Sequence, residues 1–137
     1  MVEELVVYQK ALDAARAISA ILRRPSFDRD VRLRAQLGAS SERVASDIGE
    51  GFGQKTDRHF ALYLHGSRSS SIEVRMQLQI ALDRDHITRA ELAHLGERYA
   101  EIEKMLTGLM KHLHREDRRE RGYGKTEPSR VKTKGGD

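Results

Sequence analysis

The sequence predicts an all-α protein, an up-down-up-down four-helix bundle, from its composition and from the spacing of its apolar residues. Ala, Leu, Arg and Glu favour helices and are abundant, whereas the chain contains no Trp, two Pro, four Tyr and three Phe. Apolar residues recur at three- and four-residue intervals along four stretches that short links separate. With 137 residues, 38% of them hydrophobic, the chain suits a single domain.

The first helix is predicted over residues 3–24 and carries two apolar stripes side by side. One stripe consists of Leu5, Tyr8, Leu12, Ala15 and Leu22. The other consists of Val7, Ala11, Ala14, Ile18 and Ile21. Because a monomeric bundle needs one stripe on each helix, we expect the second stripe to be buried in an oligomer. Pro25 ends the helix, since the residue before a proline is disfavoured in the α conformation.

The second helix is predicted over residues 30–48, and the segment 49–53 (GEGFG) follows it. We interpret this segment as a turn, because its three glycines permit positive φ. A third helix follows over residues 56–83, with Thr56 or Asp57 as its N-terminal cap. Small polar residues fill its centre at 66–71 (GSRSSS), so a neighbouring helix can approach closely.

The fourth helix begins at a capping box, in which Thr88 precedes Glu91 by three residues. Its apolar residues keep heptad spacing. They are Leu92, Leu95, Tyr99, Ile102, Leu106, Leu109 and Leu113. Apolar residues nearly vanish beyond residue 120, so too little surface can be buried there to offset the entropy of ordering. We therefore predict a four-helix bundle over 1–120 and a disordered basic tail over 121–137.

The net charge of +4 resides in residues 111–137, because residues 1–110 carry 16 basic and 16 acidic side chains. One local excess lies between the first two helices, where five arginines accompany Asp28 and Asp30. Guanidinium groups pair well with phosphate, and Phe27 is the one nearby aromatic side chain for base stacking, so contacts to backbone phosphates are predicted. A solvated face balanced by nearby acids is the alternative. The nucleic-acid candidates are Arg23, Arg24, Arg29, Arg32, Arg34, Arg121, Lys125, Arg130, Lys132 and Lys134.

Catalytic and cofactor motifs are not apparent. The absence of Cys excludes disulfides and thiol nucleophiles, and the six histidines lack the spacing of metal ligands. The glycines at 49–53 follow a helix instead of a strand, so they do not form a dinucleotide-binding fingerprint. We interpret Glu50 and Glu73 as anchors of helix ends or partners of arginines, not as an acid/base pair. The sequence thus predicts no enzyme, no metal and no cofactor.

Targeting signals are also not apparent. No apolar run approaches the ~20 residues of a membrane span, and the first residues do not resemble a signal peptide. We therefore expect a cytoplasmic protein with no membrane partner.

Residues along the second and third predicted helices follow a recognisable order. This order is Gln36-Leu37, then 47–53 (DIGEGFG), then Phe60, Tyr63-Leu64, Ser70, Glu73, Gln77 and Leu78. It resembles the bacterial four-helix-bundle family of proteins encoded in 23S rRNA intervening sequences, which includes the accessory variability proteins of diversity-generating retroelements. The chain departs from the family at Gly38, Ala39 and Gln54, where the family has arginines.

The resemblance implies a homopentameric ring. It also implies structural or interface roles for Gln36, Glu50, Gly51, Ser70 and Glu73. For retroelement members it further implies binding to a reverse transcriptase and to nucleic acid.

The leading hypothesis is therefore a non-enzymatic, ring-forming adaptor that binds DNA or RNA through backbone phosphates, with a reverse transcriptase as a further partner. The alternative is a purely structural homo-oligomer that binds another protein and has no nucleic-acid role. A metal- or carboxylate-dependent enzyme ranks third.

Overall fold

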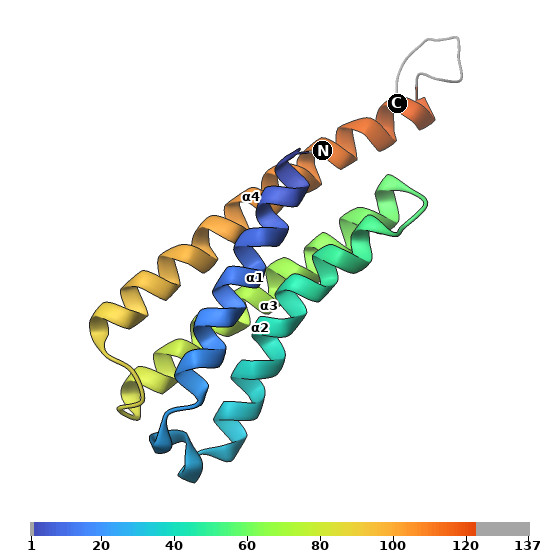
Figure 1. The fold of residues 1–137 in the computed structure, drawn as a ribbon. Coiled ribbons are helices and arrows are strands. Elements are labelled where there is room, and N and C mark those ends of the chain that lie inside the picture. The colour runs from blue at the N-terminus through green and yellow to red at the C-terminus, as the bar shows by residue number, and fades with distance from the viewer. Residues whose placement is uncertain (1, 123–137) are drawn as a thin grey trace.

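The computed structural model describes residues 2–122, and these form four long helices and one short 3₁₀ helix. The helices are α1 (Val2–Leu22), η1 (Pro25–Arg29), α2 (Val31–Phe52), α3 (Asp57–Asp83) and α4 (Arg89–Gly122). Consecutive long helices run antiparallel (Figure 1), and no strand occurs within residues 2–122. The predicted four-helix bundle is therefore confirmed. No helix in this part of the chain is long and apolar enough to cross a membrane.

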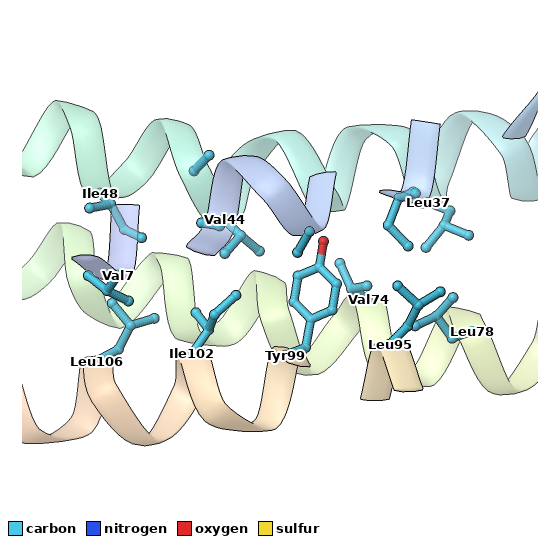
Figure 2. Close-up of a cluster of buried hydrophobic side chains, with 14 of the residues drawn as sticks. Val7, Leu37, Val44, Ile48, Val74, Leu78, Leu95, Tyr99, Ile102 and Leu106 are labelled. Carbon is cyan, nitrogen blue, oxygen red and sulfur yellow. The ribbon is translucent and has the colours of Figure 1, made fainter. Parts of the chain in front are cut away.

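The core lies along the bundle axis and receives side chains from all four long helices. Figure 2 shows Val7 of α1, Val44 and Ile48 of α2, and Ile102 and Leu106 of α4 converging on one another. The heptad positions predicted for α4 supply much of this core, with Tyr99 and Leu106 fully buried. Burial of one apolar stripe from each helix is the main favourable contribution to folding.

The stripe of α1 that faces the core is the one that we expected to lie in an oligomer interface. The stripe assigned to an oligomer, which includes Val7 and Ile18, faces the core of this subunit, and its five residues are at most 7% exposed. The other stripe flanks the core. Its Tyr8 packs against α2, where the ring lies edge-on to Phe52 with centroids 5.7 Å apart, whereas Leu5 is 60% exposed. The inference of an oligomer from this stripe was therefore wrong, because the stripe is already buried in the core of its own subunit.

The segment 49–53 is not a turn, because α2 continues through Gly49, Glu50 and Gly51 to Phe52. No glycine among residues 2–122 has a positive φ, so the reason for glycine here is space. A Cβ on Gly51 would lie only 2.6 Å from Cδ1 of Phe60 on α3. The prediction of a turn failed because helix–helix packing, not backbone freedom, explains this glycine.

The predicted caps and the small polar centre of α3 are confirmed. The Thr56 hydroxyl accepts a hydrogen bond from the backbone N–H of His59 (3.2 Å). The Glu91 backbone N–H donates to the Thr88 hydroxyl (3.1 Å), and the Thr88 N–H donates to the Glu91 carboxylate (2.9 Å). In the centre of α3, the buried Ser67 hydroxyl donates to the Val44 carbonyl of α2 (2.7 Å). This short contact requires the close approach that small side chains permit.

The fourth helix is longer than its apolar pattern requires. It continues beyond Leu113, the last buried residue, and ends at Gly122. Arg121, which we expected to begin a disordered tail, is therefore helical, and its Nε donates to Asp117 (3.2 Å). The other predicted tail residues (Lys125, Arg130, Lys132 and Lys134) lie outside the described residues.

Candidate nucleic-acid interface

The five arginines predicted to contact phosphate lie at one end of the bundle. There the α1–α2 connection, which contains η1, meets the α3–α4 connection (Figure 1). We call this region the η1 end. Arg24 is already engaged: its guanidinium forms a two-pronged ion pair with Glu91 of α4 and donates to the His86 carbonyl (3.0 Å). These bonds raise the pKa of Arg24, chiefly through the hydrogen bond to Glu91. Arg24 therefore joins the link between α1 and η1 to α4, so its guanidinium already has a partner within the subunit, and its contact with nucleic acid stays a prediction.

A buried histidine links the two connections beside Arg24. The His86 ring stacks on Phe27, with centroids 4.0 Å apart and planes 14° apart. Its Nε2 donates to the Asp30 carboxylate (2.8 Å), and its Nδ1 lies 2.8 Å from the Ser26 hydroxyl. Hydrogen bonding from His86, and then from Arg84, holds the pKa of Asp30 below its usual value. At the η1 end, charge-assisted bonds thus join residues that lie 54–67 positions apart in the chain.

Three of the five arginines remain available for a ligand. Arg23, Arg29 and Arg32 are exposed and form no ion pair within the described part of the chain. Arg34 contacts Asp28 only at 3.4 Å. Phe27 is fully buried, so it offers no surface for base stacking. We call Arg23, Arg29 and Arg32 the η1 arginines.

Sequence reasoning missed one further arginine at this end. Arg89 is the first residue of α4, is exposed, and has no ion-pair partner among residues 2–122. Arg89 is far from Arg23–Arg34 in the sequence, so the sequence does not indicate that it lies at the same end of the bundle. The Arg24–Glu91 ion pair brings the start of α4 to this end, and no local pattern could predict that pair.

The five residues with predicted structural or interface roles all lie on α2 or α3. Gly51 and Ser70 are buried, whereas Gln36, Glu50 and Glu73 are exposed.

The two carboxylates predicted as structural anchors do not share a pocket. The Glu73 carboxylate accepts hydrogen bonds from Arg43 (2.8 Å) and from Ser40 (3.0 Å) on α2. Both members of the Arg43–Glu73 pair are 48% exposed at the side chain, so this is a surface ion pair and not a core network. Glu50 lies seven residues beyond Arg43, about 10 Å along the helix axis. The geometry therefore does not bring Glu50 and Glu73 together as an acid/base pair.

The outer face of α3 exposes several large apolar side chains. Ile72, Met76 and Ile80 follow one another at four-residue steps, which places them on one face of the helix. Met76 is 64% exposed, and Leu62, nearer the start of α3, is 62% exposed. We call Leu62, Ile72, Met76 and Ile80 the α3 apolar face.

Comparisons with known proteins identify the family and the fold. Residues 3–108 match the model of the 23S rRNA-intervening sequence protein family. A crystal structure from Bacteroides thetaiotaomicron, described as a protein of unknown function from the S23 ribosomal protein family, superposes with a TM-score of 0.72. The two chains are 20% identical, and the match covers 80% of this chain and 98% of the other. A search among curated proteins finds no match.

Proposed function

This chain belongs to the 23S rRNA-intervening sequence protein family, and we propose that it is a non-enzymatic adaptor that binds nucleic acid through backbone phosphates. The observation that carries the proposal is the set of η1 arginines: three exposed guanidinium groups without acidic partners in the described residues, at an end of the bundle where partly buried hydrogen bonds join the two connections. Arginine pairs with phosphate through two parallel hydrogen bonds, which suits recognition of a nucleic-acid backbone.

The chemistry of the η1 end favours phosphate contacts over base recognition. Phe27, its aromatic ring nearest to the arginines in sequence, is covered by His86. Base-specific or single-strand recognition usually needs exposed aromatic rings or a helix that enters a groove. Binding should therefore depend strongly on salt and only weakly on sequence.

Assembly into a ring, if it occurs as the resemblance implies, would strengthen binding to a long polyanion. Each η1 end is only modestly basic, because Asp28, Asp83 and Asp85 lie in or beside the same connections. A homopentamer, which the family resemblance implies, would repeat the η1 arginines five times and gain avidity without a strong individual site. The α3 apolar face provides surface for such assembly, because exposed apolar patches commonly mark protein contacts.

The α3 apolar face also favours the second candidate function, a scaffold that binds only protein. A reverse transcriptase is the partner that the resemblance to retroelement accessory proteins implies. Such a partner would bury Leu62 and Met76, which are the most exposed residues of this face. If the protein is such a scaffold, the η1 arginines should not be required for binding its partner.

A gel-retardation experiment with a labelled RNA hairpin and a DNA duplex tests the proposal. We expect wild-type protein to retard both at low salt. The variant Arg23→Gln/Arg29→Gln/Arg32→Gln should bind more weakly. The slope of its log affinity against log salt concentration should be smaller by the amount that corresponds to about three phosphate contacts per subunit. It should melt as wild type does, because surface substitutions usually change stability by no more than ~0.5 kcal/mol. Absence of retardation by wild-type protein would refute nucleic-acid binding and leave the protein-only scaffold.

A further inference from the structure

A second group of arginines gathers at the end of the bundle opposite the η1 end. The first turn of α3 and the last turns of α4 border a cleft of about 710 Å³. Figure 1 shows α4 extending past the α2–α3 connection at this end. We call this feature the α3–α4 cleft. Its lining is Arg58, Arg115, Asp117, Arg118, Arg119, Arg121 and Gly122.

Two of these arginines have a structural explanation. Arg119 pairs with Glu116 (3.2 Å) and Arg121 with Asp117 (3.2 Å), at the three- and four-residue spacings that stabilise a helix. Both lie in the last turn of α4, where positive charge is favoured by the helix dipole. Their pairing with acids stabilises the last turns of α4, which lie beyond its last buried residue.

The remaining three arginines have no such explanation. Arg58, Arg115 and Arg118 are exposed and form no ion pair within residues 2–122. Arg58 lies in the first turn of α3, where the helix dipole disfavours a cation. The stability of α3 therefore does not explain an arginine at this position. Binding of a negatively charged ligand would explain it.

The α3–α4 cleft and the hollow beside it differ in the charge of their linings. Five arginines and one aspartate line the α3–α4 cleft. A neighbouring hollow of about 410 Å³ contains Lys55 and Arg121 but also Asp57, Asp117 and Glu120, so its lining is net acidic. An anion approaching this end of the bundle is thus attracted to the cleft and repelled by the adjacent hollow.

We propose that the α3–α4 cleft is a second binding site for backbone phosphates of nucleic acid, with Arg58, Arg115 and Arg118 as the contacting residues. This inference rests on the proposed function and extends it to a separate surface. Among residues 2–122 the lining contains guanidinium groups and no aromatic ring, so these residues suit phosphodiester groups better than bases. The 22 residues of α2 separate the two ends of the bundle, which corresponds to about 33 Å. At this distance the two sites should contribute independently.

Three variants with equal loss of charge test the inference. The cleft variant is Arg58→Gln/Arg115→Gln/Arg118→Gln, and the η1 variant is Arg23→Gln/Arg29→Gln/Arg32→Gln. The control variant, Arg16→Gln/Arg98→Gln/Lys104→Gln, removes three positive charges between the two ends. Fluorescence anisotropy with a labelled RNA hairpin over a series of KCl concentrations gives the affinity and its salt dependence. Circular dichroism melting checks that each variant is folded.

We expect the cleft variant to bind the hairpin at least about tenfold more weakly than wild type, with a salt slope smaller by about three. The control variant should bind nearly as wild type does. If the η1 variant loses affinity while the cleft variant binds like the control, the inference about the cleft is wrong and the proposed function stands. If wild-type protein does not bind the hairpin at low salt, the proposed function itself fails.

Discussion

Tyr99 shows at the scale of one residue that the core is not fully optimised. Its ring projects from α4 into the centre of the bundle (Figure 2), and the side chain is fully buried. Its hydroxyl is one of two buried side-chain polar atoms without a hydrogen-bond partner in the described residues, the other being Oε1 of Gln77. Burial also raises the pKa of Tyr99, because the charged phenolate is disfavoured away from water.

We expect Tyr99→Phe to raise the free energy of unfolding by about 1 kcal/mol, because the variant no longer buries an unpaired hydroxyl. Urea denaturation monitored by circular dichroism measures this difference. A decrease of similar size would mean that the hydroxyl is bonded in the folded protein, which contradicts the geometry described above.

Glu91 makes the stability of the bundle depend on pH. Its carboxylate pairs with Arg24 and accepts the Thr88 N–H, and these interactions lower its pKa from 4.5 to about 2. A lowered carboxyl pKa stabilises the folded state above the ordinary pKa, and this stabilisation is lost as the pH falls toward 2. The two side chains are 39% and 32% exposed, so solvent screening limits the effect.

We expect Glu91→Gln to lower the free energy of unfolding by about 1 kcal/mol at neutral pH, because it removes the charge that pairs with Arg24. Glutamine can still accept the Thr88 N–H, so the capping box is retained. The difference between wild type and variant should shrink as the pH falls from 4.5 to 2. Denaturation curves over this pH range provide the measurement, and a difference that did not change with pH would count against the ion pair.

At the scale of the helices, glycine has different roles at different positions. Gly51 allows α2 and α3 to pack closely, because the ring of Phe60 occupies the space of its missing side chain. Gly96 on α4 has no atom within 4 Å of the position that a Cβ would occupy. The first glycine is required by packing between helices, whereas the second only weakens its own helix.

We expect Gly51→Ala to lower the free energy of unfolding by about 1–3 kcal/mol, because it overpacks the α2–α3 contact. The matched change Gly96→Ala should raise it by about 0.5–1 kcal/mol, since alanine favours the helix. Thermal melting of the two variants beside wild type tests both signs. Equal stabilisation by both substitutions would show that Phe60 moves aside at little cost.

At the scale of the whole molecule, charge and apolar surface are separated. The η1 arginines and the α3–α4 cleft lie at the two ends of the bundle, whereas the α3 apolar face runs along its side. This separation suits a subunit that associates through its sides and contacts a polyanion through its ends.

We expect light scattering to show a pentamer for wild-type protein and smaller species for Met76→Glu. Met76 is 64% exposed in one subunit, so a charge there should not unfold the helix but should oppose burial against a second copy. Ala100→Glu, at an exposed position on α4, is the control and should assemble as wild type does. If wild-type protein is a monomer, or if the Met76→Glu variant still forms the pentamer, the α3 apolar face is not an interface between subunits.

The sequence by itself determined the features that depend on local interactions. The capping residues Thr56, Thr88 and Glu91 were predicted because each cap is formed within four residues of the chain. The core positions of α4 were predicted because heptad spacing defines one face of a helix. The family was also recognisable from the residues of α2 and α3.

Tertiary structure decided the features that depend on residues far apart in the chain. Both stripes of α1 have helical spacing, and only contacts with α2 and α4 determine which one faces the core. In the sequence Arg24 resembles the neighbouring arginines, and only the fold brings Glu91, 67 residues away, into an ion pair with it. Arg58 joins Arg115 and Arg118 because the first turn of α3 lies beside the last turns of the antiparallel α4. Local patterns encode helices and their caps, whereas long-range packing decides which side chains remain free to bind a partner.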